Sequence, residues 1–219
     1  DQIDGRRVGG AQVCQARMPL AARVGHGKAA ECGVGFDGNA SGGGHPIAQR
    51  LEQGAFGRAN IEGRPVVASA DDFTVRGGAA DAAIRRKFEQ CELMAHSLKI
   101  PLIRMIDGTG GGGSVKTLEM VGATYVPAVP GWGDVVKNLE SVPVVALALG
   151  PTAGLGAARV VASHYSIMVK GLSQLFAAGP AVVEAIGEAS DKESLGGSAI
   201  HTRNGVVDEE VGSEAEAFA

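Results

Sequence analysis

Short apolar runs alternate along the chain, from Gly63 onward, with longer stretches in which apolar and charged residues recur at helical spacing. The apolar runs predict β-strands at residues 65–70, 101–106, 142–149 and 165–169. The stretches between them predict helices at residues 80–98, 132–139 and 154–162. Because residues 142–149 are apolar without interruption, this strand is expected to be buried on both faces. Strands and helices in this order predict an α/β fold with a largely parallel sheet and right-handed crossovers.

The two ends of the chain lack this pattern. Residues 1–56 show only weak periods, at 17–23 and 46–56, and clusters such as GVGFDG and NASGGGHP are typical of turns. We therefore divide the chain into a poorly patterned N-terminal segment, residues 1–56, and a domain at residues 57–219. The acidic tail from Val207 (VDEEVGSEAEAFA) is expected to be a solvated helix end without a capping signal, as though cut from a longer chain.

Composition narrows the fold and the kinds of partner. Of 219 residues, 34 are glycine and only 4% are aromatic, so the core is expected to consist of Ala, Val, Leu and Ile packed between helices and buried strands. The net charge of −4 provides no positive field for a nucleic-acid backbone. No apolar run reaches the roughly 18 to 20 residues that cross a bilayer. We therefore expect neither nucleic acid nor a membrane as a partner.

Cysteine usage and the first residues indicate a compartment. Cys14, Cys32 and Cys91 form no CxxC pair, and their odd number fits a reducing environment better than a disulfide framework. The N-terminal sequence DQIDGRRVGG carries charges where a signal peptide would be apolar. We expect a cytoplasmic protein, or one of the mitochondrial matrix if the organism is eukaryotic.

Two glycine-rich turns follow predicted strands and precede predicted helices. The first is GTGGGG at residues 108–113, and the second is GPTAGLG at residues 150–156. At the carboxyl ends of parallel strands, such turns expose backbone N–H groups to one crevice. One N–H donor aimed at a developing oxyanion in a dry site contributes roughly 3 to 4 kcal/mol. The pair predicts an anion-holding site built from backbone; ordinary tight turns are the structural alternative.

Other chemistries have less support in the sequence. Residues 108–113 satisfy GxGxxG, but a run of consecutive glycines does so by accident, and the acidic residue about 20 positions later, Asp134, lies at a helix start. Lys116 and Thr117 come too late for a phosphate-binding GxxxxGK[ST] loop. The histidines are scattered and no GxSxG occurs, so neither a zinc site nor a serine triad is predicted.

The same elements and turns carry an ordered set of short motifs. They are RPVV at 64–67, DFTVRGG at 72–78, PLI at 101–103, TGG at 109–111, VP at 142–143, GPTAG at 150–154, MVK at 168–170, Phe176, GP at 179–180, LGG at 195–197 and HT at 201–202. In this order they resemble the carboxyltransferase (β) subunits of biotin-dependent acyl-CoA carboxylases, of the acetyl-, propionyl- and methylcrotonyl-CoA carboxylase type. The resemblance covers about residues 57 to 219.

The resemblance implies a fold, a reaction and partners. That family contains two crotonase-like domains, each a spiral of ββα units, and this chain resembles the N-terminal one. The implied reaction moves a carboxyl group from carboxybiotin, held on a partner carrier domain, to the α-carbon of an acyl-CoA through a thioester enolate. The implied partners are acyl-CoA, a biotin carboxylase or biotin carrier subunit, a C-terminal carboxyltransferase domain that completes the site, and further copies in a dimer or hexamer. No metal is implied in this chain.

The resemblance also implies site residues. Gly110 and Gly111 match the glycine pair of the family's DSGGAR-type loop, and Gly154 matches the first glycine of its GPxAGGA helix start. Together with Leu155, they are expected to supply backbone amides to oxyanion holes. The glycines expected near acyl-CoA or biotin are Gly77, Gly78, Gly112 and Gly156. The sequence departs from the family's motifs by an early acid at Asp107, a glycine at position 113 in place of arginine, and Leu155 in place of glycine.

Other interpretations stay open at this point. The decarboxylating subunit of a biotin-dependent acyl-CoA decarboxylase shares these motifs and runs the transfer in reverse. A non-catalytic crotonase-like oligomerisation domain is permitted by the departures at Gly113 and Leu155. A nucleotide-binding α/β protein fits the first glycine turn alone.

Overall fold

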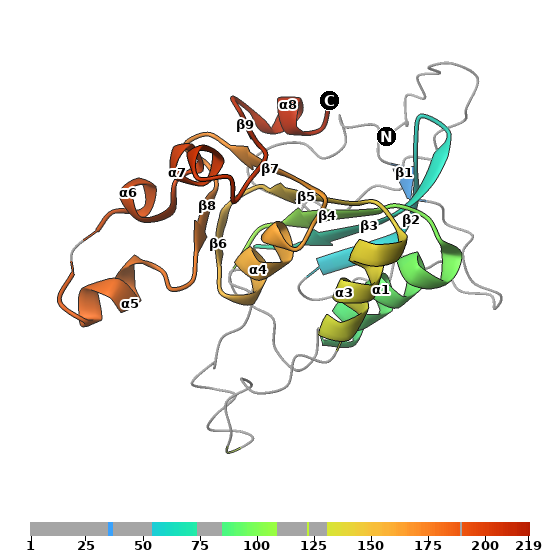
Figure 1. Cartoon of the computed structure of the whole chain (residues 1–219), viewed down its shortest axis with the longest axis horizontal. Coiled ribbons are helices and arrows are strands. Elements are labelled where there is room, and N and C mark those ends of the chain that lie inside the picture. The colour runs from blue at the N-terminus through green and yellow to red at the C-terminus, as the bar shows by residue number, and fades with distance from the viewer. Residues whose placement is uncertain (1–34, 37–53, 74–84, 109–121, 123–130, 189) are drawn as a thin grey trace, which may run out of the picture.

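The central element of the computed structural model is a seven-stranded sheet (Figure 1). The structure describes residues 35–36, 54–73, 85–108, 122, 131–188 and 190–219. In spatial order the strands are β1 (Gly35–Phe36), β2 (Gly54–Ile61), β3 (Arg64–Asp71), β4 (Leu102–Ile106), β5 (Val144–Ala148), β7 (Tyr165–Val169) and β9 (Glu209–Val211). The β1–β2 and β2–β3 pairs are antiparallel, and every later pair is parallel. The predicted α/β class with a largely parallel sheet is confirmed.

A tight hairpin joins β2 to β3. Ile61 pairs with Arg64, so that only Glu62 and Gly63 form the turn. Both have positive φ angles, 51° and 80°, as a type I′ turn requires. Such a turn matches the right-handed twist of the flanking strands, which explains how a glycine-rich segment without a clear period forms a regular β2.

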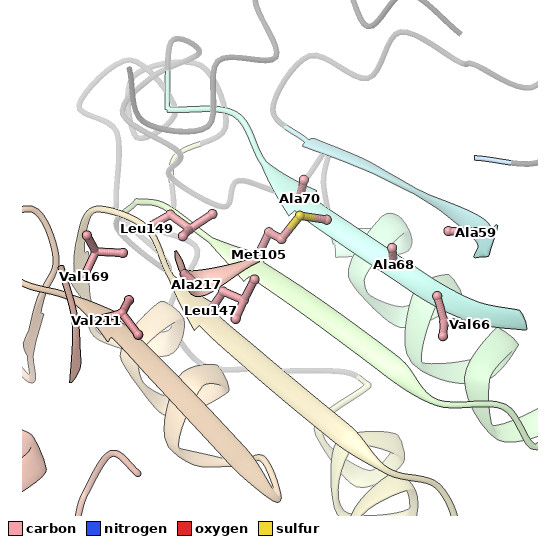
Figure 2. Packing of buried hydrophobic residues seen from close by; sticks show 10 residues of the cluster. All are labelled: Ala59, Val66, Ala68, Ala70, Met105, Leu147, Leu149, Val169, Val211 and Ala217. Carbon is pink, nitrogen blue, oxygen red and sulfur yellow. The ribbon is translucent and has the colours of Figure 1, made fainter. Parts of the chain in front are cut away.

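Successive residues of a strand pack into separate apolar clusters on the two faces of the sheet. In β3, Val66, Ala68 and Ala70 belong to one apolar cluster, whereas Val67 belongs to another on the opposite face. The cluster shown in Figure 2 joins β3, β4, β5, β7 and β9 to the short helix α8 (Glu214–Ala217). Four of the five β5 residues are buried, in clusters on both faces, which confirms the burial predicted for this segment.

The larger helices cover the other face of the sheet (Figure 1). They are α1 (Arg85–Leu98), α3 (Trp132–Ser141) and α4 (Leu155–Val161). Cys91 and Ala95 of α1 pack with Val144 of β5, and Val160 of α4 packs with Ile106 of β4. These helices confirm the predicted amphipathic segments, although residues 80–84 of the first lie outside the described residues.

Residues 150–153 were expected to form only a turn, and this is wrong. Residues Pro151–Ala153 form β6, which pairs in parallel with β8 (Gln174–Phe176) in a second, two-stranded sheet. Its partner lies more than twenty residues later, so no local period indicates the pairing. The short helices α5 (Pro180–Ala185), α6 (Lys192–Gly196) and α7 (Ser198–Arg203) follow β8.

The acidic tail is not a solvated helix end. Residues Glu209–Val211 form β9, which joins the sheet beside β7, and Ser213 caps α8 by accepting a hydrogen bond from the Glu216 N–H. Val207 and Val211 are buried. The carboxylates of the tail are mostly exposed, while the two valines face the core. Because two of the three residues of β9 are charged, the sequence did not indicate the edge strand.

Candidate functional site

The two glycine turns begin at the same edge of the central sheet. After β4, the carbonyl of Ile106 accepts a hydrogen bond from the Leu149 N–H at 2.9 Å. Two residues further on, the carbonyl of Gly108 accepts one from the Ala153 N–H at 3.4 Å. The first residue of one turn therefore contacts the residue directly before Gly154 in the other, as the parallel order of β4 and β5 predicts.

Asp107 and Gly150 fit closely against one another between the turns. Asp107 is only 3% exposed. A Cβ atom added at Gly150 would lie 2.0 Å from the Asp107 Oδ1 and 2.7 Å from its Cγ. A side chain at position 150 would have to displace the Asp107 carboxylate, so the early acid noted in the first turn has a structural role in this junction.

The second turn ends at Gly154, in a backbone conformation that favours glycine. Its φ of 58° and ψ of −120° would strain any other residue. Its N–H donates to the carbonyl of Phe176 in β8 at 2.9 Å. The protein itself therefore occupies this amide, which corrects the expected role of Gly154 as a donor to a ligand. The glycine turns the chain and anchors it to the second sheet.

The next amides belong to the first turn of α4, where helical N–H groups have no partner within the helix. Leu155 is half-buried and Gly156 is buried. Among the described residues, neither backbone N–H donates a hydrogen bond to any group. The positive end of the α4 dipole lies here as well. This corner can therefore offer donors to an anionic oxygen.

A half-buried carboxylate at the end of β3 contacts both β4 and α4. Asp71, the last residue of β3, receives a hydrogen bond from the backbone N–H of Asp107 and pairs with Arg159 of α4, whose Nη1 lies 3.3 Å from the Asp71 Oδ1. Burial raises the pKa of the Asp71 carboxyl above its ordinary value, and the nearby Arg159 charge opposes that shift. The guanidinium of Arg159 also lies 5.0 Å from the ring centre of Phe88 in α1. These contacts tie α4 to the ends of β3 and β4.

The remaining site residues expected from the sequence are not described. Gly77, Gly78, Gly110, Gly111 and Gly112 lie outside the described residues, so their proximity to Leu155 stays a prediction. The sequence analysis did not identify Arg159, because a single charged residue in a mostly apolar helix does not indicate a functional role. It also missed Arg104, although a charge inside the run PLIRMI was a usable sign that a polar partner lay beneath the sheet.

Within the residues that the structure describes, no group of three or more His, Cys, Asp or Glu side chains could hold a metal ion. Over the same residues, no helix combines the length and apolar character that a membrane crossing requires.

Comparison with known sequences relates most of the chain to one family. Residues 54–219 match the family described as "Carboxyl transferase domain". The chain is 32% identical over 142 residues to a probable biotin-dependent acyl-coenzyme A carboxylase beta2 subunit of Mycobacterium tuberculosis, covering 64% of this chain and 26% of that protein. It is 31% identical over 153 residues to the human mitochondrial propionyl-CoA carboxylase beta chain, covering 67% and 26%. It is also 31% identical over 150 residues to the methylmalonyl-CoA decarboxylase subunit alpha of Veillonella parvula, covering 66% and 28%.

Solved structures give the same relation. Transcarboxylase 12S, described as a hexamer with hydrolysed methylmalonyl-coenzyme A bound, has a TM-score of 0.64 and 27% identity, and the match covers 76% of this chain and 32% of that one. The beta subunit of P. aeruginosa geranyl-CoA carboxylase has a TM-score of 0.65 at 21% identity over 76% and 31% of the two chains, which shows a shared fold. The chain thus spans about a quarter to a third of the length of the proteins that it matches.

Proposed function

Since this chain belongs to the carboxyl transferase domain family, we propose that it is the N-terminal, acyl-CoA-binding part of a biotin-dependent acyl-CoA carboxyltransferase. The observation that carries the proposal is the hydrogen bond between Ala153 and Gly108, because it brings the beginning of both glycine turns to one edge of the sheet. A thioester bound at this edge would meet backbone amides from two elements. Backbone amides can stabilise a negatively charged oxygen without the help of a titratable side chain.

The amides of α4 define the first donor set. Leu155 and Gly156 follow the strained corner at Gly154, and in the described part of the chain their N–H groups are not used by the protein. We assign to them the oxygen of the acyl thioester. When the α-proton leaves, negative charge develops on that oxygen, and donors fixed in advance stabilise the enolate more than the neutral thioester.

The second donor set is proposed at Gly110 and Gly111, which follow Gly108 by two and three residues. Gly77, Gly78 and Gly112 are proposed in the vicinity of acyl-CoA or biotin. Biotin, carried on a partner domain, supplies the carboxyl group as carboxybiotin. The new carbon–carbon bond at the α-carbon would form as the N–C bond of carboxybiotin breaks, and the α-proton would end on the biotin nitrogen, while this chain orients the thioester and holds its oxygen.

This chain matches only part of each relative, so we also propose further domains and subunits. Because the matches cover only about a quarter to a third of the relatives' length, we propose that a C-terminal carboxyltransferase domain completes the site. A biotin carboxylase and carrier subunit would recharge biotin, and further copies of the chain would form a dimer or hexamer. The proposed location is the cytoplasm, or the mitochondrial matrix in a eukaryote.

The test is carboxyl transfer from a carboxylated biotin carrier to acetyl-CoA and propionyl-CoA, measured with a full-length protein that contains residues 1–219. Gly111→Pro removes one proposed amide donor, and Gly111→Ala keeps it. We expect a loss of roughly 100-fold or more in kcat for the proline variant relative to the alanine variant. Equal rates for the two would contradict the role of Gly111, and no transfer by the wild type would contradict the proposed reaction.

A second candidate rests on the similarity to the V. parvula protein, whose name specifies decarboxylation. The same donors would then stabilise the enolate left when a carboxylated acyl-CoA loses its carboxyl group to biotin. Carboxylated carrier appearing from methylmalonyl-CoA, faster than the reverse transfer, would favour this direction. A non-catalytic oligomerisation domain would instead show no binding of CoA thioesters in calorimetry.

A further inference from the structure

An arginine lies in the middle of the sheet, where a charge is costly. Arg104 occupies the third position of β4 and is 0% exposed. It points to the same side of the sheet as Leu102 and Ile106, whose clusters face α1 and α4. A buried guanidinium at this position needs partners for all of its N–H groups.

Glu92 of α1 supplies one side of the required contacts. The Arg104 Nε donates to the Glu92 Oε1 at 2.9 Å, and Nη2 donates to Oε2 at 3.0 Å, which makes a bidentate pair. Glu92 is itself only 1% exposed and also accepts a hydrogen bond from the side-chain amide of Asn138 in α3 at 2.7 Å. The carboxylate is thereby fixed between two helices.

The remaining nitrogen of Arg104 holds the end of α4. Nη1 donates to the carbonyl of Arg159 at 3.1 Å and to the carbonyl of Ala162 at 2.6 Å. The last carbonyls of a helix have no partner within the helix, and a cation placed among them also opposes the negative end of the helix dipole. Arg104 therefore anchors the C-terminal end of α4 to β4 and, through Glu92, to α1.

Stability alone is a weak reason for this arrangement. Replacing a buried ion pair with apolar residues of similar volume is often neutral or stabilising. Apolar side chains could fill the volume of Arg104 and Glu92, but they could not bind the two carbonyls of α4. Anchoring α4 is the contribution that only the guanidinium makes.

The opposite end of α4 is where this anchoring has its effect. The helix has seven residues, and only Gly156 and Val160 of them are buried. With about 1.5 Å of rise per residue, its ends lie roughly 10 Å apart. Because so short a helix moves as a rigid body, a displacement of its end at Ala162 would displace the corner at Ala153 and Gly154 by a similar distance. At that corner the Ala153 N–H donates to the Gly108 carbonyl, and the Gly154 N–H donates to the Phe176 carbonyl.

We propose that Arg104 is a positioning residue, which sets the place of α4 and thereby holds the start of this helix in register with the Gly108 end of β4. The inference rests on the proposed function insofar as that edge binds the acyl thioester. The effect on α4 itself can be measured without any assumption about the reaction.

The experiment compares three variants of the full-length protein. Arg104→Met with Glu92→Met removes both charges and keeps the volume, so the fold is retained while the anchor is lost. Glu92→Gln weakens the ion pair but leaves Arg104 on the carbonyls of α4. Lys137→Met removes an exposed partner of Asp134 on α3 and serves as the matched surface control. Readouts are hydrogen exchange of peptides covering α4 and α3, thermal unfolding, and kcat and KM for carboxyl transfer.

The proposal predicts that the variants affect α4 exchange, stability and kcat differently. In the double variant, α4 amides should exchange at least about tenfold faster, and by a larger factor than the amides of α3, which loses only the side-chain hydrogen bond from Asn138 to Glu92. The value of kcat should fall at least about tenfold with KM within about twofold. Glu92→Gln should lower the unfolding temperature but leave kcat within about twofold of the wild type, and Lys137→Met should change neither. Unchanged α4 exchange in the double variant would overturn the positioning role, whether or not the wild type transfers carboxyl groups. Absence of transfer by a wild type whose α4 responds as predicted would overturn the proposed reaction alone.

Discussion

The backbone N–H of Ala153 donates to the carbonyl of Gly108 at 3.4 Å, across two turns that are 45 residues apart in the sequence. This contact joins the end of β4 to the residue before the α4 corner. Backbone atoms alone make it, so side-chain substitutions nearby act on it through sterics and backbone strain.

The first prediction concerns the junction of Gly150 and Asp107. Gly150→Ala should lower the free energy of unfolding by about 2 to 3 kcal/mol, because the added Cβ would lie 2.0 Å from the Asp107 Oδ1. Chemical denaturation in urea measures this change. The control is Gly133→Ala on α3, where no described residue lies within 4 Å of the added Cβ, and alanine should stabilise the helix by about 0.5 to 1 kcal/mol. Equal effects at the two positions would refute the close fit.

The second prediction concerns backbone strain at Gly154. Among the residues that the structure describes, a Cβ at this position would meet no atom within 4 Å, so Gly154→Ala tests backbone conformation and not packing. With φ at 58° and ψ at −120°, we expect a loss of about 1 to 3 kcal/mol in the free energy of unfolding. Gly179→Ala, at a φ of −73° and equally open, should change stability by less than about 0.5 kcal/mol. A Gly154→Ala variant as stable as Gly179→Ala would mean that the corner relaxes freely.

A third prediction concerns the buried thiol of Cys91. Burial, followed by the charge of Glu92, raises the pKa of Cys91 to about 12. Between pH 9 and pH 12 the unfolded chain loses this proton while the folded chain keeps it, so stability should fall as pH rises through that window. Relative to Cys91→Ala, the wild type should lose about 2 kcal/mol between pH 8 and pH 10.5. Parallel pH profiles for the two proteins would show that the thiol ionises as easily in the fold as outside it.

Most of the central sheet could be predicted because its strands are short apolar runs, and the composition of each run indicates by itself that the strand is buried. Residues 144–148 and 165–169 illustrate this, since their burial on the sheet follows from their own composition. The pairing of β6 with β8 could not be predicted, because three residues carry too short a period and their partner is distant. The same reason applies to β9, where Val211 is the single buried residue among carboxylates.

The candidate site was predicted by position and not by atom. The parallel order of β4 and β5 brings together Gly108 and Ala153, where the two predicted turns begin. The residues that follow Gly108 lie outside the described part of the chain, so the site itself stays a prediction. Which amide remains available could not be foreseen, because the Gly154 N–H is taken by Phe176, a residue of the second sheet. Likewise, the roles of Arg104 and Arg159 depend on helix ends that meet only in three dimensions.

The central claim is that backbone N–H groups at the start of α4 hold the thioester oxygen. Leu155→Pro tests it most directly, because proline is well tolerated at the first position of a helix and removes only that donor. Leu155→Ala keeps the N–H and controls for the lost side chain. With carboxyl transfer to propionyl-CoA as the measurement, and with both variants folded by circular dichroism, we predict a kcat about 100-fold lower for the proline variant than for the alanine variant. Values of kcat within about twofold of each other would contradict the claim.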